Sequence, residues 1–266
     1  MLKYDTSHIN EFTNLNSTGR LAVMKLIVKE TYMDCCKEAA SLFIELINKK
    51  PDALLGLATG DTPKGLYKML IEAYGAGEAD FSRVRTVNLD EYAGLPASHD
   101  QSYMYFMQEH LFKHINIDQN NITIANGTAD TAEEEYRMRR FFDNNRVDLQ
   151  LLGVGRNGHI GFNEPDTKLH ASFHYTALTD DTIDANSRMF ANADDVPRGA
   201  LTMGMGEIMQ AYKIIMLANG VSKADAVSGL ITTDCIDPMN PCTMLKLHPD
   251  VTVIIDRELA DAIGAA

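Results

Sequence analysis

Short apolar runs alternate with stretches of helical periodicity along most of this 266-residue chain. The apolar runs are typical of buried strands and occupy residues 26–28, 54–58, 84–89, 147–152, 213–218 and 251–255. Between them, apolar residues recur at intervals of three and four, which predicts amphipathic helices such as one over residues 33–49. Strands that alternate with helices favour a largely parallel sheet with helices on both faces. We therefore predict a doubly wound α/β fold.

Two stretches interrupt this alternation. Residues 1–23 begin with a polar segment rich in Asn, Thr and Ser, so we predict a poorly ordered N-terminal extension followed by one α/β domain over residues 24–266. Residues 180–197 are also polar and irregular, and a short strand is expected just before them. We therefore predict a mobile lid near residues 173–200.

The charge of the chain restricts its partners. Its 37 acidic and 24 basic residues give a net charge of −13, which argues against a nucleic-acid surface because phosphate backbones require basic residues. An anionic small molecule is compatible only if positive groups gather locally. No apolar run approaches the roughly 20 residues of a membrane helix, and no secretory signal is evident, so we expect a cytoplasmic protein without a membrane partner. The sequence leaves the oligomeric state open, and a homo-oligomer is compatible with it.

Polar side chains follow four of the predicted strands. They occupy positions 59–62, 90–91, 153–164 and 220–223. In parallel sheets ligands bind at the carboxyl ends of the strands, so these residues are expected to meet in one cleft. Asp90 and Glu91 are neighbours on an extended chain and point in opposite directions, so one can enter the cleft while the other pairs elsewhere.

Residues 153–165 read Gly-Val-Gly-Arg-Asn-Gly-His-Ile-Gly-Phe-Asn-Glu-Pro and allow two interpretations. The first three glycines match a dinucleotide-binding fingerprint, and Asp180 lies about where a ribose-binding acid would follow. That interpretation requires a helix after Gly158, which Pro165 interrupts, so we reject it. The alternative is an acid–base apparatus in which Glu164 orients His159 and stabilises its charged form. No third ligand is obvious beside these two, so we predict no metal.

Thr59-Gly60-Asp61-Thr62 opens a predicted helix and is a candidate anion cradle. Backbone amides and the helix dipole favour negative charge at such a position, although a plain capped turn has the same pattern. The carboxylate of Asp61 must turn away from a bound phosphate, because like charges repel. The candidate cations are Arg188, in the predicted lid, and Lys223, in the first turn of a helix.

With these residues assembled, the sequence closely resembles the glucosamine-6-phosphate deaminase family. The matching motifs follow the family's order from about residue 24 to the C-terminus. They are Leu57-Ala-Thr-Gly-Asp-Thr-Pro, Asn88-Leu-Asp-Glu-Tyr-Ala-Gly-Leu-Pro, the whole of residues 153–165, Ala185-Asn-Ser-Arg, Ala200-Leu-Thr-Met-Gly-Met-Gly and Gly220-Val-Ser-Lys-Ala. The segment that begins at His159 is specific, since the related sugar-phosphate lactonases share the glycines and the histidine but continue differently.

The resemblance implies a Rossmann-like fold and a cofactor-free reaction in which glucosamine 6-phosphate and water give fructose 6-phosphate and ammonia. Asp90 matches the base that moves a proton from C2 to C1 of the sugar. His159 matches the group that opens the sugar ring, with Glu164 and Asn157 as its relay. The phosphate and substrate contacts of the family are matched by residues 59–62, Arg188 and Lys223.

Three departures from the family pattern affect these expectations. Asn157 stands where many members have Asp, and an amide can orient a partner but cannot act as a base. Since the resemblance extends to working enzymes with Asn here, we expect a modified relay. Asp61 replaces a Gly or Ser, which leaves phosphate affinity and sugar preference open. Basic residues that follow the Asn-Glu-Pro in allosterically regulated members are replaced at 172–176 by Ser-Phe-His-Tyr-Thr, so we expect no activation by N-acetylglucosamine 6-phosphate.

Two other functions remain open from the sequence. The first is a deaminating isomerase of another amino-sugar phosphate, such as galactosamine 6-phosphate, which differs at a single hydroxyl group. The second is a catalytically silent sugar-phosphate sensor, which Asn157 and Asp61 would suit. The joint presence of Asp90, His159 and Glu164 argues against the sensor.

Overall fold

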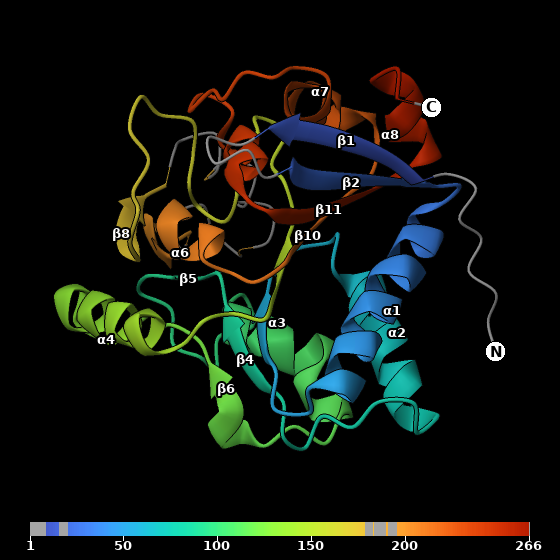
Figure 1. The fold of residues 1–266 in the computed structure, drawn as a ribbon. Helices are drawn as coiled ribbons and strands as arrows, with labels where there is room; N and C mark the ends of the chain where they lie inside the picture. Colours follow the sequence, from blue (N-terminus) through green and yellow to red (C-terminus); the bar gives the residue numbers. More distant parts are fainter. Residues whose placement is uncertain (1–8, 16–20, 179–182, 184–189, 191–195, 266) are drawn as a thin grey trace.

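The computed structural model describes residues 9–15, 21–178, 183, 190 and 196–265. Within them, the centre is an eight-stranded sheet with the order β1-β2-β11-β10-β7-β3-β4-β6 (Figure 1). β1 and β2 pair antiparallel, and all other neighbours in this sheet are parallel. The strands are β1 (Ile9–Leu15), β2 (Leu21–Lys29), β3 (Leu54–Leu57), β4 (Arg85–Asn88), β6 (Ile122–Thr123), β7 (Leu149–Leu152), β10 (Ile214–Ala218) and β11 (Asp250–Asp256).

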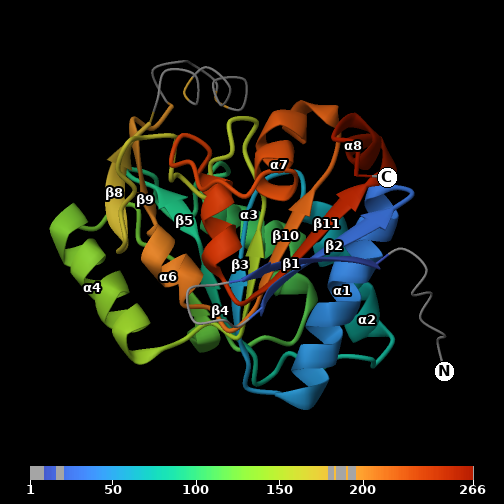
Figure 2. The same cartoon turned by 45° about the horizontal axis from the view of Figure 1, so that its top comes forward.

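Helices cover both faces of this sheet. α1 and α2 lie side by side on one face, whereas α4 and α6 lie on the opposite side (Figures 1 and 2). The helices are α1 (Tyr32–Lys49), α2 (Lys64–Gly75), α3 (Tyr103–His110), α4 (Thr131–Asn144), α6 (Met205–Met209), α7 (Ala224–Ile231) and α8 (Arg257–Ala262), with 3-10 turns η1 (Phe112–His114), η2 (Gln119–Asn121), η4 (Val221–Lys223) and η5 (Pro241–Leu247). The predicted doubly wound α/β fold is confirmed. None of these helices is long and apolar enough to cross a bilayer.

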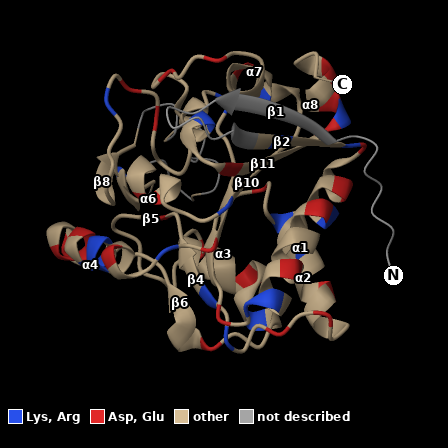
Figure 3. Cartoon of the chain, in the orientation of Figure 1, with Lys and Arg blue, Asp and Glu red and all other residues tan. Residues whose placement is uncertain are grey.

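The charged helix α4 lies at the surface, as its composition indicates. Asp130 caps its first turn by accepting the backbone N–H groups of Ala132 and Glu133. Acidic and basic side chains are mixed along α4 and along α1 (Figure 3). Mixed charges of this kind suit solvated helix faces and form no basic stripe on either helix.

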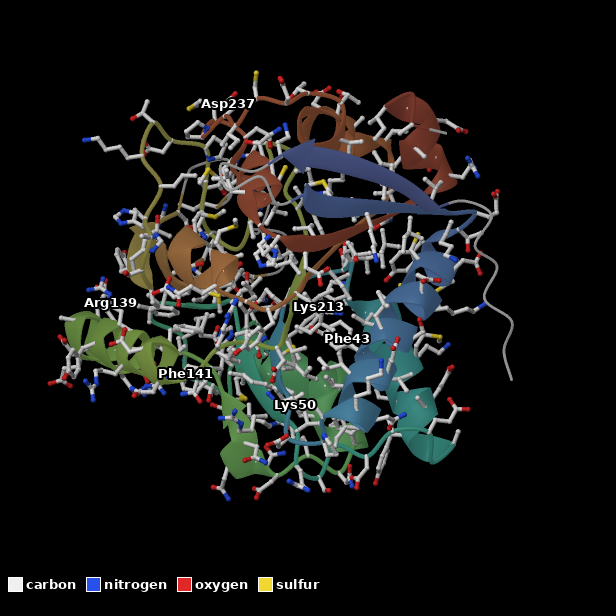
Figure 4. All side chains as sticks on the ribbon, in the orientation of Figure 1. Phe43, Lys50, Arg139, Phe141, Lys213 and Asp237 are labelled. Carbon is white, nitrogen blue, oxygen red and sulfur yellow. The ribbon has the colours of Figure 1, made fainter. Side chains whose placement is uncertain are left out.

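The helix α1 shows how the predicted periodicity becomes packing. The hydroxyl of Thr31 accepts the N–H of Asp34 at 3.2 Å and begins the helix. The apolar positions Cys36, Phe43 and Ile47 are buried, and Phe43 points from α1 toward the interior (Figure 4). The core therefore forms where the apolar face of α1 meets the fully buried strand β10, whose five residues are all apolar.

A small second sheet was not expected from the sequence. Its order is β5 (Asp90–Tyr92), β9 (Gly199–Thr202) and β8 (His174–Ala177), all antiparallel. We predicted one strand over residues 84–89, but β4 ends at Asn88 and the chain then changes sheets. Leu89 makes the transition, because its N–H donates to Leu57 in β3 and its carbonyl accepts from Met203.

The N-terminal part also differs from expectation. β1 forms within residues that we predicted to be poorly ordered, and β2 begins at Leu21 rather than near residue 26. Backbone pairing along β1 and β2 explains this, since a strand at a sheet edge needs no strong apolar pattern of its own. The short strand expected before residue 180 is present as β8. Most of residues 179–195 lie outside the described residues, and the division into an extension and one domain with a lid stays a prediction.

Candidate active site

The candidate site lies where the connections of the central sheet reverse direction. The chain leaves β3 toward β4 on one side and leaves β7 toward β10 on the other, so β3 and β7 are neighbours at a topological switch point. In doubly wound sheets a ligand binds in the crevice at such a point, outside the carboxyl ends of the strands. The carboxyl ends of β10 and β11 point to the top in Figure 2. The loops after β3, β7 and β10 leave the sheet at this same edge.

His159, Asn157 and Glu164 form a connected group on the loop after β7. Nδ1 of His159 lies 3.3 Å from Oε1 of Glu164, as an electrostatic contact rather than an aligned hydrogen bond. Nδ2 of Asn157 donates to Oε2 of the same carboxylate at 2.8 Å, and its Oδ1 accepts the N–H of His159 at 3.2 Å. The carboxylate is thus held by an amide and faces the imidazole, so it can orient the ring.

Gly155 makes room for the imidazole of His159. A methyl group at residue 155 would lie 2.3 Å from Nδ1 of His159, well inside van der Waals contact. The N–H of Gly155 also donates to the carbonyl of His159 at 2.9 Å and closes the turn. No helix follows in residues 159–172, so the pyrophosphate-binding helix of a dinucleotide site is missing. Gly155 leaves space for the ring of His159 rather than for a pyrophosphate group. This supports our rejection of the dinucleotide interpretation.

Asp90 is a buried carboxylic acid at the start of the small sheet. Its side chain is 6% exposed, and it forms no hydrogen bond or ion pair with any residue that the structure describes. Burial, with a smaller contribution from the charge of Glu91, raises the pKa of Asp90 to about 8. A methyl group on Gly161 would lie 3.3 Å from Oδ2 of Asp90, so the carboxyl group is adjacent to the loop that carries His159. A carboxyl group of this kind is suited to proton transfer near neutral pH.

Glu91, unlike Asp90, has a structural role. Its carboxylate accepts the backbone N–H groups of Tyr92 at 2.9 Å, Tyr103 at 2.8 Å and Met104 at 3.0 Å. Two of these donors belong to the first turn of α3, where a negative charge is favourable. Burial still raises the pKa of Glu91, and the three donors oppose that shift. The sequence left open which of the two carboxyl groups pairs elsewhere. In the structure Glu91 is paired, whereas Asp90 is unpaired.

The loop at residues 59–62 has free backbone donors. The N–H groups of Thr59, Gly60 and Thr62 donate to no residue in the described part of the chain. Asp61 turns outward: its side chain is 87% exposed, and its carboxylate lies 2.8 Å from Nζ of Lys64. α2 begins at Lys64, directly after Pro63. The carboxylate of Asp61 is therefore no obstacle to an anion on the inner side of the loop.

Lys223 lies at the junction of η4 and α7, half-buried. Burial lowers its pKa, and the positive charge of Arg156 lowers it further. Two cations thus approach each other at the ends of the neighbouring strands β7 and β10, which favours a bound anion between them. Sequence reasoning missed Arg156, although a cation within a glycine-rich loop was the available signal. Arg188, the other predicted cation, lies outside the described residues.

The described residues contain no cluster of three or more His, Cys, Asp or Glu side chains that could hold a metal ion. Nδ1 of His159 faces the carboxylate of Glu164. The arrangement is thus an acid–base pair, a separate buried carboxyl group, a loop of free amides after β3, and two cations after the nearby strands β7 and β10. These are the parts of an α/β enzyme that acts on a small anionic molecule.

Comparison with known proteins identifies the family. Residues 28–254 match the family of glucosamine-6-phosphate isomerases and 6-phosphogluconolactonases, and the chain belongs to that family. The glucosamine-6-phosphate deaminase of Clostridium perfringens (strain 13) is 51% identical over 243 residues, which are 89% of this chain and 98% of the relative. The enzyme of the same name from Thermoanaerobacter pseudethanolicus is 50% identical over 242 residues, 90% of this chain and 95% of the relative.

Solved structures agree with this assignment. A structure described as a monomeric glucosamine-6-phosphate deaminase has a TM-score of 0.86 and 44% identity, and covers 90% of this chain and 100% of its own. The 6-phosphogluconolactonase of Trypanosoma cruzi has a TM-score of 0.70 at 19% identity, over 89% of this chain and 95% of its own. At that identity the second likeness concerns the fold alone.

Proposed function

We propose that this protein is a glucosamine-6-phosphate deaminase, which converts glucosamine 6-phosphate and water to fructose 6-phosphate and ammonia. The observation that carries the proposal is the buried, unpartnered carboxyl group of Asp90 beside the loop of His159 and Glu164. A base that takes a proton from carbon must be desolvated, with a pKa near the working pH, and Asp90 has both properties. The deaminases that are about half identical over most of the chain support the same function.

The phosphate group is proposed to bind to the loop at residues 59–62 and to the neighbouring cations. The free amides of Gly60 and Thr62 supply donors, and the outward turn of Asp61 removes the like charge that would oppose binding. Lys223 and Arg156 supply positive charge from the neighbouring strand ends. We assign Arg188 to the same role from the family resemblance. A chain with a net charge of −13 can hold an anion here because its positive charges are local.

Ring opening is assigned to His159. The anomeric hydroxyl must lose a proton and the ring oxygen must gain one, and an imidazole can exchange protons with both. Glu164 stabilises the imidazolium that exists between these two transfers. Asn157 holds Glu164 with its amide and therefore acts on the histidine through the carboxylate.

Isomerisation and loss of ammonia are assigned to Asp90. The ionised carboxyl group removes the proton from C2, and a proton of the substrate's ammonium group passes to the C1 carbonyl oxygen, which becomes the hydroxyl of an enolamine. Return of the proton to C1 leaves an imine at C2. Water then adds to C2, the carbon–nitrogen bond breaks, ammonia leaves and the ketone of fructose 6-phosphate remains. Water is consumed, so the reaction is formally a hydrolysis.

We further propose that the reaction serves the catabolism of N-acetylglucosamine in the cytoplasm. Cys35, Cys36, Cys235 and Cys242 are all free thiols, which suits a reducing compartment.

A galactosamine 6-phosphate deaminase is the closest alternative, because only the orientation of one hydroxyl distinguishes the substrates. The sensor is disfavoured, since Asn157 bonds to Glu164 and Asp61 turns outward, so neither residue disables the site.

The decisive experiment supplies the purified protein with glucosamine 6-phosphate and, separately, galactosamine 6-phosphate, and measures ammonia release. We expect release from the glucosamine compound with formation of fructose 6-phosphate. Asp90→Asn should reduce turnover by about a thousandfold or more while binding persists, because it removes the base with little change in shape. Ammonia from neither sugar would favour the sensor, and substantial turnover by Asp90→Asn would remove Asp90 from its role.

A further inference from the structure

The hydroxyl group of Tyr32 reaches the base of the loop at residues 59–62. It donates to the carbonyl of Thr62 at 2.9 Å and lies 3.3 Å from the carbonyl of Asp61. The same oxygen accepts the N–H of Gly65 at 2.9 Å. One side chain therefore joins the last residues of the loop to the first turn of α2.

Gly65 allows this close approach. A methyl group at residue 65 would lie 2.8 Å from Oη of Tyr32 and 2.6 Å from Sγ of Cys36, and both neighbours are fixed in α1. Gly65 is buried in the first turn of α2, where backbone N–H groups have no carbonyl partner within the helix. The phenol hydroxyl thus takes the place of a helix cap, since Pro63 offers no side-chain cap.

Tyr32 is itself held in place by the helix α1. It is the first residue of α1, directly after the capping residue Thr31, and α1 packs along α2 (Figure 1). Burial, aided by the neighbouring thiol of Cys36, raises the pKa of Tyr32 to about 12, so the hydroxyl keeps its proton at any working pH. It can therefore donate to Thr62 and accept from Gly65 at the same time.

We propose that Tyr32 is a positioning residue for the phosphate group of the substrate, because its hydroxyl fixes the end of the loop that presents the N–H groups of Gly60 and Thr62. Tyr32 itself does not contact the phosphate. It acts by holding the loop that does. Donors that are held in place before binding cost less entropy to order, so an anchored loop binds an anion more tightly than a free one. The inference rests on the proposed function only in identifying the anion as a sugar phosphate.

The test uses Tyr32→Phe, which removes one oxygen and keeps the ring, with Tyr136→Phe as the matched control. Tyr136 lies on α4 and is 66% exposed, and its hydroxyl bonds to no described residue. Binding of inorganic phosphate is measured by calorimetry, and KM and kcat are measured with glucosamine 6-phosphate. Amide exchange at Gly60 and Thr62 reports the order of the loop.

We expect Tyr32→Phe to weaken phosphate binding and to raise KM by about three- to tenfold, the effect of one net hydrogen bond. The value of kcat should stay within about twofold, and amide exchange at Gly60 and Thr62 should accelerate. Tyr136→Phe should leave all of these unchanged.

An unchanged phosphate affinity in Tyr32→Phe would overturn the inference, even if the variant melted at a lower temperature, because the residue would then be merely structural. A wild-type protein that binds no phosphate would overturn it as well. If the wild type bound phosphate, lost affinity on Tyr32→Phe and released no ammonia, the inference would stand and the proposed function would fail.

Discussion

At the scale of single residues, the state of Asp90 connects burial to chemistry. Burial raises the pKa of its carboxyl group to about 8, far above that of an exposed aspartate. The group must be ionised to accept a proton from C2, so the fraction of ready enzyme falls as pH drops below 8. We expect kcat/KM to fall about tenfold per pH unit on this acidic limb. A profile that is flat between pH 6 and pH 9 would contradict the assignment.

The same shift predicts that Asp90 reduces stability at high pH. In the unfolded chain the carboxyl group ionises near pH 4, whereas in the fold it stays neutral up to about pH 8. Its neutral form therefore favours the fold below pH 4, and this contribution is lost as pH rises from 4 to 8. Asp90→Asn, which does not titrate, should melt close to wild type at pH 4 and at a progressively higher temperature toward pH 8. Thermal melts across that range provide the check, and parallel pH dependence in both proteins would refute the expectation.

At the scale of elements, α3 depends on a residue outside itself. The carboxylate of Glu91 accepts two N–H groups of the first turn of α3, and the side chain of Ser102 caps the same turn. We expect Glu91→Ala to lower the free energy of unfolding by about 2 kcal/mol, since buried donors lose a charged acceptor. Glu91→Gln keeps one acceptor oxygen and should lose less. Denaturant unfolding measures both variants, and an unchanged midpoint in Glu91→Ala would contradict the capping role.

The elements also show what sequence could and could not predict. Periodicity predicted α1 closely, because this helix has one apolar face that the core must cover. The change of sheets at Leu89 was not predictable, since an apolar run over residues 84–89 does not reveal which partner each backbone group will find. At the candidate site, the strand-end rule predicted which loops leave the sheet at one edge. It could not decide between Asp90 and Glu91, which depends on where α3 begins, nor could it show that Asp61 turns toward Lys64.

At the scale of the whole molecule, the segment after Pro165 is held by contacts within the chain. The N–H of Phe173 donates to Glu207 at 2.7 Å, and its carbonyl accepts from Arg139 at 2.7 Å. The rings of His170 and His174 stack with their centroids 4.1 Å apart. Arg139 is thus already engaged with the backbone and with Glu135, and is not a free cation for a second phosphate.

We therefore expect no activation by N-acetylglucosamine 6-phosphate. Initial rates against glucosamine 6-phosphate should follow a hyperbola, and addition of the acetylated sugar should leave both the shape of the curve and its midpoint unchanged. Sigmoidal kinetics that become hyperbolic in its presence would show that a second site exists.

The isolation of Asp90 has a consequence for the choice of substrate. Near pH 7 its side chain is mostly uncharged in the empty protein, so the site at rest holds no competent base. An amino sugar brings an ammonium group next to the carbon that is to be deprotonated, and a cation there draws the proton off the carboxylic acid. A hexose phosphate without the amine lacks this cation and is expected to leave the acid neutral. We therefore expect the amine of the substrate to ionise Asp90 before the carbon–nitrogen bond breaks.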